Sequence, residues 1–131
     1  MSHLLDTNIA SSYIRGNPGV MRRLRAHPPS LVAISSITRM ELRFGAERRN
    51  NPSLTQAVAA FVGGITVCPF DEQAADAAGR LRARLERRGA RLGYADALIA
   101  AHALALGWIL VTSDQDFARV EGLELENWAS D

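Results

Sequence analysis

Acidic side chains stand at four separate places where the chain is otherwise apolar. They are Asp6 in HLLDTN, Glu41 in ITRMEL, Asp96 in YADALIAAHA, and the pair Asp114 and Asp116 in ILVTSDQDF. A carboxylate beside a hydrophobic core normally raises the cost of folding, because burial removes water from its charge. Four such sites in different segments therefore indicate a shared cation. Oxygen ligands without histidine or thiolate favour Mg²⁺ or Mn²⁺.

Each acid also has an ordinary structural explanation when it is taken alone. Asp6 could cap a following helix, since Asp is a favoured N-cap residue. Glu41 could reach water from the margin of an apolar helix face, and Asp96 could be a first-turn acid favoured by the helix dipole. Asp114 and Asp116 could be turn residues after a strand. The coincidence of all of them in one chain favours a joint role.

The order of apolar runs and helix signals predicts the elements that must position these acids. Short strands are expected at 3–6, 31–34, 65–68 and 108–112, with a possible fifth at 123–127. Helices are expected at about 8–15, 18–27, 36–49, 54–62, 72–89 and 94–106. Strands that alternate with helices are typical of an α/β fold with a parallel sheet between helical layers.

This topology gives two of the acids a common location. Ligand sites in open parallel sheets form beyond the carboxyl ends of the strands. Asp6 ends the first strand and Asp114 follows the fourth by two residues, so both are expected at that edge. Glu41 lies four residues after Ile37 and three before Phe44, which places the three on one helix face and directs Glu41 inward.

The same spacing argument applies to Asp96. It lies four residues after Leu92 and three before Ile99, so its side chain is also expected to face inward. Hydroxyl side chains near the strand ends could position the acids or their waters, although turn and capping roles are the commoner ones for such residues. They are Thr7, Ser35 and Thr112.

Composition narrows the setting. The chain has 131 residues, 47% of them hydrophobic, which predicts one domain over 1–131 with a proper core. The single cysteine, Cys68, allows no internal disulfide and no thiolate cluster for zinc. No apolar run reaches the roughly 18 to 20 residues that a bilayer requires, and no signal-peptide pattern opens the chain, so we expect a cytoplasmic protein without membrane contact.

The basic residues are unusual. All 15 are arginine, and lysine is absent, which codon bias alone could explain. The absence of lysine excludes phosphate-loop NTPases, Schiff-base enzymes and receiver domains, because each needs a positioned lysine. The net charge of +1 argues neither for nor against a polyanionic partner.

The acidic segments resemble those of PIN-domain ribonucleases, and among them the VapC-type toxins of bacterial toxin–antitoxin pairs. The resemblance covers nearly the whole chain in order, through LLDTNI, ISSITRMEL, YADALIAAHAL, ILVTSDQDF and VEGLELENW. It implies a PIN-like three-layer sandwich with a central parallel sheet of four to five strands flanked by helices. The family's metal and catalytic positions match Asp6, Glu41, Asp96 and Asp114, with Asp116 as the fifth candidate.

The implied activity is that of an Mg²⁺-dependent endoribonuclease, with Mn²⁺ as the alternative ion. Asp6 and Asp96 are expected to bind the metal directly, with Glu41 orienting or deprotonating the attacking water and Asp114 completing a shared or second site. The division of labour between Asp114 and Asp116 stays open at this point. So does the number of ions.

The resemblance further implies a homodimer and a VapB-type antitoxin that occludes the acidic pocket, within a larger toxin–antitoxin complex. RNA contacts are expected from arginines, although a solvated helix face is the alternative explanation. The candidates are Arg39 and Arg43 beside Glu41, and a series at helical spacing, Arg80, Arg84, Arg87 and Arg91. Transfer RNA and ribosomal RNA are both open as substrates.

Other functions stay open as well. A haloacid dehalogenase-type phosphatase needs a second Asp where this chain has Asn8, and it needs a lysine. A PIN-domain nuclease that processes RNA without an antitoxin, or a non-catalytic module that binds RNA or a protein, are the remaining alternatives.

The histidines and tryptophans are expected to serve the fold. His102 lies in an apolar helix and is predicted to be a packed or surface residue, and His3 and His27 have no partner at metal-site spacing. Trp108 and Trp128 are predicted to anchor the core and the tail.

Overall fold

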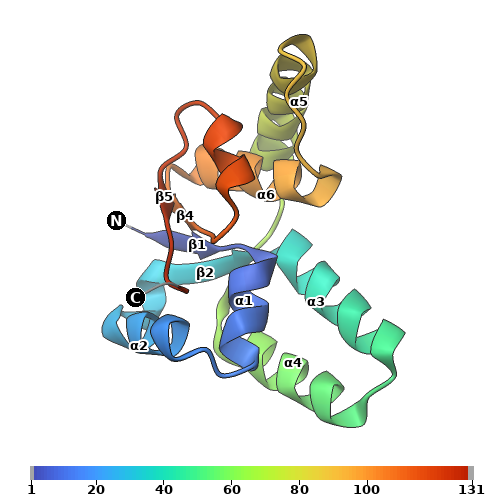
Figure 1. Cartoon of the computed structure of the whole chain (residues 1–131), viewed down its shortest axis with the longest axis vertical. Coiled ribbons are helices and arrows are strands. Elements are labelled where there is room, and N and C mark those ends of the chain that lie inside the picture. Colours follow the sequence, from blue (N-terminus) through green and yellow to red (C-terminus); the bar gives the residue numbers. More distant parts are fainter. Residues whose placement is uncertain (1, 130–131) are drawn as a thin grey trace.

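The computed structural model describes residues 2–129, which form a five-stranded parallel sheet in the order β3-β2-β1-β4-β5 (Figure 1). Leu4 of the central strand lies opposite Ala33 on one side and Leu110 on the other. The strands are β1 His3–Leu5, β2 Val32–Ser35, β3 Thr66–Cys68, β4 Ile109–Val111 and β5 Leu125–Glu126. The predicted strand order along the chain is confirmed, including the short fifth strand.

In the described part of the chain, six α-helices and two short 3₁₀ helices connect the strands. Asn17, Asn51 and Asp71 each accept a backbone N–H at the start of the helix that follows them. The helices are α1 Thr7–Ile14, α2 Pro18–Ala26, α3 Ser36–Arg49, α4 Pro52–Gly64, α5 Glu72–Arg87 and α6 Tyr94–Leu106, with η1 Pro29–Leu31 and η2 Gln115–Arg119. The prediction for α4 was too short at both ends, because Asn51 caps it before Pro52 and the two glycines 63–64 continue it.

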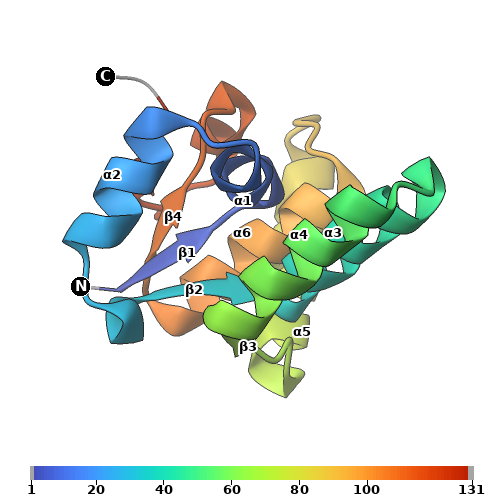
Figure 2. The same ribbon diagram turned by 90° about the horizontal axis from the view of Figure 1, so that it is seen from below.

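The sheet separates two hydrophobic cores. Because side chains alternate across a strand, Leu4 and Leu110 pack with α5 and α6, whereas Leu5 and Val111 pack with α1, α2, α3 and α4. Figure 2 shows α2 at one end of this second layer and the α3–α4 pair at the other. The arrangement is the three-layer sandwich that was expected. Among residues 2–129, no helix has both the length and the apolarity needed to cross a membrane.

The C-terminal segment is anchored at the end of β1 remote from Asp6. Trp128 is 1% exposed and stacks on His27 with ring centroids 4.7 Å apart. Its indole N–H donates to Glu126, which also lies 3.2 Å from His3 Nε2. The tail role expected for Trp128 is confirmed, and the two histidines contribute to the same ring cluster.

The carboxyl ends of the parallel strands gather the starts of several helices at one edge of the sheet. Strand β1 leads through Asp6 into α1, β2 leads directly into α3, and β4 leads toward η2. Helix α3 packs against both α1 and α6 (Figure 1). The segments that carry the acids therefore meet at this edge.

Helix α6 ends where Gly107 adopts a left-handed conformation with φ 70°. Its N–H donates to the carbonyl of Leu104, which closes the helix and lets β4 begin two residues later. A residue with a Cβ is strained in this conformation even though no atom lies within 4 Å of the Cβ position.

We predict opposite effects for two glycine substitutions. Gly107→Ala should lower the free energy of unfolding by about 1 kcal/mol because of the backbone strain. Gly79→Ala should raise it by about 1 kcal/mol, because Gly79 lies inside α5 with free space around its Cβ position. Urea unfolding of both variants measures the difference, and a Gly107→Ala protein as stable as Gly79→Ala would contradict the argument.

Candidate active site

Asp6 is a buried carboxylate at the carboxyl end of β1. It is 2% exposed, and its Oδ1 accepts the Ile9 N–H at 2.8 Å as the N-cap of α1. Burial, together with the charges of Asp96 and Asp114, raises its pKa to about 6, although the hydrogen bonds from Thr112 and Ile9 act in the opposite direction. Capping is therefore one role of Asp6, but a cap alone does not require other acids nearby.

Asp96 occupies the first turn of α6 and interacts electrostatically with all of the other candidate acids. Burial raises its pKa, and the charges of Glu41, Asp114 and Asp116 raise it further. Its charge in turn raises the pKa of Asp6. The expected inward direction holds, but the spacing from Leu92 was not its cause, because that residue precedes the start of α6.

Glu41 reaches the site from α3 through a hydrogen bond to α1. The Thr7 hydroxyl donates to Glu41 Oε1 at 2.5 Å, and its oxygen lies 3.3 Å from Thr38 Oγ1. The expected face of α3 was wrong, since Phe44 is 59% exposed and the buried residues include Thr38 and Leu42. Glu41 stands at the boundary of the buried face, one turn after Thr38, and this position directs it toward Thr7.

Asp114 and Asp116 have different surroundings in η2. Asp114 Oδ1 accepts the Asp116 N–H at 2.9 Å, and the Asp114 N–H donates to Thr112 Oγ1 at 3.0 Å. Asp114 is half-buried and its charge acts on both Asp6 and Asp96. The side chain of Asp116 is 55% exposed and lies 3.4 Å from Arg119. This geometry favours Asp114 as the inner member of the pair.

Two of the three predicted hydroxyl residues contact acids. Thr7 donates to Glu41, and Thr112 makes a side-chain hydrogen bond to Asp6. Ser35 does not contact the acids. Its oxygen caps α3 at the Ile37 N–H and lies 2.8 Å from Nδ1 of the buried His102.

His102 is a packed residue, as expected. It is 2% exposed, its ring packs edge-on against Phe70, and burial lowers its pKa while the charge of Asp71 opposes that shift. A neutral imidazole between Ser35 and Phe70 belongs to the interior between α3, α5 and α6.

The donor atoms that converge here are carboxylate and hydroxyl oxygens, which suit a hard divalent cation. Within residues 2–129, no three histidine, cysteine or acidic side chains stand close enough together to enclose an ion. Mg²⁺ does not require such a cage, because it keeps several waters and binds through one or two carboxylates. The buried Asp6 and its neighbour Asp96, which repel each other, fit that requirement.

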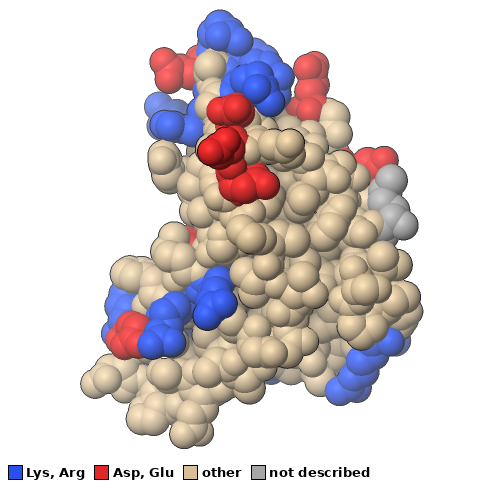
Figure 3. Space-filling model, turned by 180° about the vertical axis from the view of Figure 1, so that it is seen from behind, with Lys and Arg blue, Asp and Glu red and all other residues tan. Residues whose placement is uncertain are grey.

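The candidate arginines do not form one stripe. Arg80, Arg84 and Arg87 are exposed on α5, but Arg91 lies in the loop after the helix ends at Arg87, which corrects the expected series. On α3, Arg39 is exposed and Arg43 pairs with Glu47 at 3.0 Å. Figure 3 shows arginines gathered at the top of the view, where α5 lies, and separately on the side of α3.

Sequence reasoning missed Arg119. Besides pairing with Asp116, its Nη1 donates to the carbonyl of Arg91 at 2.5 Å, so it ties η2 to the loop before α6. The spacing of three residues from Asp116 was the available signal, because residues that far apart are neighbours on a helix.

Comparison with known proteins agrees with this geometry. Residues 3–123 match the family described as PIN domain. The chain belongs to the PIN-domain family. Divalent metal ions are the general cofactors of PIN-domain nucleases.

Within the family, the similarity is to VapC ribonucleases of toxin–antitoxin systems. The chain is 39% identical to the tRNA(fMet)-specific endonuclease VapC of Shigella flexneri, over 98% of this chain and 99% of that protein. It is 34% identical to ribonuclease VapC2 of Haemophilus influenzae, over 98% of each. The crystal structure of DNA-bound VapBC from Salmonella typhimurium matches with a TM-score of 0.90 at 37% identity over 98% of both chains.

The structure of VapBC2 from Rickettsia felis, bound to a DNA fragment from its promoter, matches with a TM-score of 0.89 at 32% identity, over 98% of this chain and 99% of that one. The chain is thus a VapC-type ribonuclease. The fold, family and activity that the acidic segments implied are confirmed, whereas the roles of individual acids stay predictions.

We predict that Asp6→Asn stabilises the metal-free PIN domain at neutral pH. The pKa of Asp6 is about 6 in the folded protein against an ordinary value of 3.8, so the folded state binds the proton more tightly and stability falls as pH rises through this interval. Asparagine removes the charge but still accepts the Ile9 N–H. Without divalent metal at pH 7.5, the free energy of unfolding of the variant should exceed that of wild type by about 1 to 3 kcal/mol.

The gain should vanish below about pH 4, where Asp6 is protonated in both states. Denaturant unfolding at several pH values in excess chelator measures it. Asp71→Asn is the matched control, because Asp71 caps α5 from an exposed position. A pH-independent difference, or none at pH 7.5, would show that the Asp6 charge does not oppose folding.

Proposed function

We propose that this chain is an Mg²⁺-dependent endoribonuclease that acts as the toxin of a toxin–antitoxin pair, with Mn²⁺ as an alternative ion. Electrostatic interaction of Asp96 with four other carboxylates at the carboxyl edge of the sheet is the observation that carries the metal dependence. Carboxylates with raised pKa values gather at functional sites, and a bound cation would relieve their repulsion.

Asp6 and Asp96 are the proposed direct ligands of the ion. Bound Mg²⁺ would supply an activated water and would neutralise charge on the phosphate. Glu41 is held by Thr7 and is the proposed group that orients or deprotonates the attacking water. Asp114 shares or completes the metal site, supported by its charge interactions with both ligands, and Asp116 has an outer role beside Arg119.

The proposed substrate is transfer RNA, and specifically the initiator tRNA(fMet). Two relatives that share 39% and 37% of their residues with this chain over nearly their full lengths are named for that specificity. Because a single-stranded loop exposes its phosphates and bases, an open acidic edge flanked by arginines is suited to a tRNA loop.

The proposed partner is a VapB-type antitoxin, supported by the full-length match to solved VapBC complexes. We place the protein in the cytoplasm as a single PIN domain over 1–131 that forms a homodimer. The antitoxin would bind near the acidic edge, where an arginine of its C-terminal segment can neutralise the carboxylates.

Asp96→Asn should abolish cleavage and leave the fold intact. Loss of the central carboxylate should lower the rate of Mg²⁺-dependent cleavage of a tRNA(fMet) transcript by roughly 100-fold or more. Elongator methionine tRNA tests the specificity, and Asp76→Asn, on the exposed face of α5, is the control. Full activity of the variant, or wild-type activity in excess chelator, would contradict the mechanism.

Substitution of the η2 acids should separate their roles. Asp114→Asn should lower the cleavage rate by roughly 100-fold, whereas Asp116→Asn should lower it less than about 10-fold, because Asp116 is exposed and paired with Arg119. A titration of Mg²⁺ in the same assay should show weaker apparent metal affinity for Asp114→Asn alone. The reverse order of effects would make Asp116 the inner acid.

A further inference from the structure

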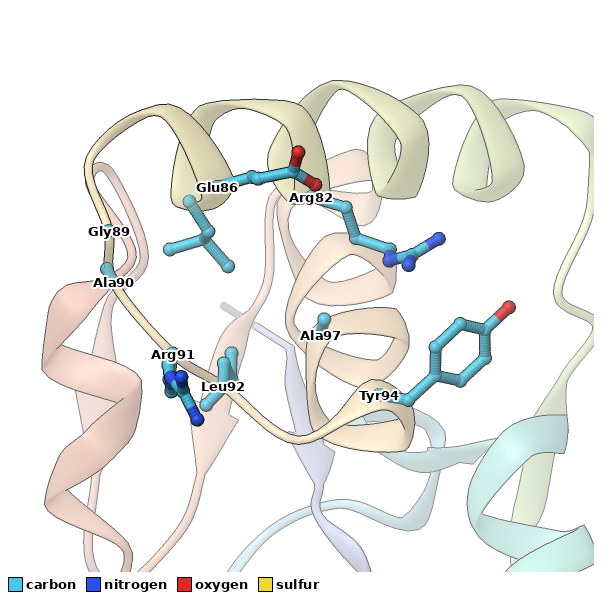
Figure 4. A pocket seen from close by; sticks show the side chains of 9 residues that line it. Arg82, Glu86, Gly89, Ala90, Arg91, Leu92, Tyr94 and Ala97 are labelled. Carbon is cyan, nitrogen blue, oxygen red and sulfur yellow. The ribbon is translucent and has the colours of Figure 1, made fainter.

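A cavity of about 510 Å³ lies beside the start of α6, between α5 and the loop that joins the two helices (Figure 4). Leu85, Leu92 and Ala97 supply its apolar lining. The polar part of its lining comes from Arg82, Glu86, Arg91 and Tyr94. Cavities of this size bind small organic groups, and an apolar floor with few polar groups suits a flat aromatic ligand.

Tyr94 is the exposed aromatic wall of this cavity. The residue is 64% exposed, and the Arg82 guanidinium carbon lies 4.7 Å from its ring centroid. Figure 4 shows the Arg82 side chain extending from α5 toward the ring. The pair presents together an aromatic ring, on which unpaired RNA bases stack, and a guanidinium group, which can bind a phosphate.

The loop that forms the other wall is held in place before any ligand binds. The Ala90 N–H donates to the Leu85 carbonyl at 2.9 Å at the end of α5. Arg119 donates to the Arg91 carbonyl, and Arg88 donates to the Arg119 carbonyl at 2.7 Å. The wall is thereby fixed to η2, which carries Asp114 at its start and Asp116 within it.

Tyr94 and the proposed metal ligand Asp96 share the first turn of α6 but point in different directions. Two residues correspond to about 200° of rotation around a helix, and a helix with its side chains is about 10 to 12 Å wide. An RNA strand that crosses the start of α6 would thus reach the cavity within roughly three nucleotides of the bond at Asp96.

We propose that this cavity binds one unpaired nucleotide of the RNA substrate near the cleaved bond. Its base stacks on Tyr94 over the apolar floor, and its phosphates are held by Arg82 and Arg91. The inference rests on the proposed ribonuclease function, and it adds a second contact that fixes which bond enters the acidic site.

The test is single-turnover cleavage of tRNA(fMet) in Mg²⁺ by the full-length chain. Tyr94→Ala should lower kcat/KM by roughly 10-fold, the effect expected for the loss of one stacked base. Tyr94→Phe keeps the ring and should stay within about twofold of wild type. Phe44→Ala is the matched control, because Arg48 lies over the exposed Phe44 ring in a similar pair on α3.

A second arm locates the nucleotide. We would prepare a set of tRNA(fMet) substrates that each lack one base, at about three positions on each side of the mapped cleavage site, and measure kcat/KM for each. At one position, removal of the base should lower kcat/KM of wild type about as much as the Tyr94→Ala substitution does. Removal of the same base should lower kcat/KM of Tyr94→Ala little further. Arg82→Ala should lower the slope of log kcat/KM against log salt concentration by about one, because one phosphate contact is lost.

Each outcome bears on the proposal in a distinct way. Unchanged kcat/KM in Tyr94→Ala, or base-removal effects of equal size in wild type and Tyr94→Ala, would overturn the nucleotide site while leaving the ribonuclease function standing. A wild-type protein that cleaves no RNA would instead contradict the proposed function. Thermal unfolding of the variants excludes misfolding, which the exposure of Tyr94 makes a minor effect.

Discussion

Repulsion between carboxylates at one edge of the sheet is the constraint on which the rest of the structure depends. Asp6 is almost fully buried, and burial together with the charges of three further acids raises the pKa of Asp96. Carboxylates that repel one another stay close together only when several elements of the fold hold them in place. Here β1, α3, α6 and η2 each supply a part, so no local segment can form the site by itself.

The parallel sheet makes this convergence possible. Because β1 and β4 are neighbours with the same direction, Asp6 and the turn before Asp114 emerge side by side, with Thr112 in contact with both. Two hydrophobic cores pack against the two faces of the sheet and supply the favourable free energy that offsets the cost of the charges. The helices α3 and α6 then bring acids that no strand carries.

The sequence predicted the positions of the two acids that follow strands for the right reason. Asp6 and Asp114 come shortly after the ends of β1 and β4. The alternation of strands with helices in the sequence indicates where those strands end. Glu41 and Asp96 were expected in the right place for partly wrong reasons, because helix spacing cannot tell that Phe44 is exposed or that Leu92 precedes α6. Arg91 was grouped by helical spacing with the arginines of α5, but the helix ends four residues before it. The Tyr94 cavity depends on the loop between α5 and α6. Tertiary hydrogen bonds from Arg119 to the Arg91 carbonyl and from Arg88 to the Arg119 carbonyl hold this loop, and they leave no periodic pattern in the sequence.

The double duty of Asp6, as a helix cap and as a site acid, has an evolutionary consequence. One nucleotide change converts an aspartate codon to an asparagine codon, and asparagine caps a helix as well as aspartate does. Because Asp6 is a proposed metal ligand, we expect this single change to remove the activity of the toxin and to leave its fold intact. The product would still present the surfaces that an antitoxin recognises, and it would compete for antitoxin against active toxins of the same cell.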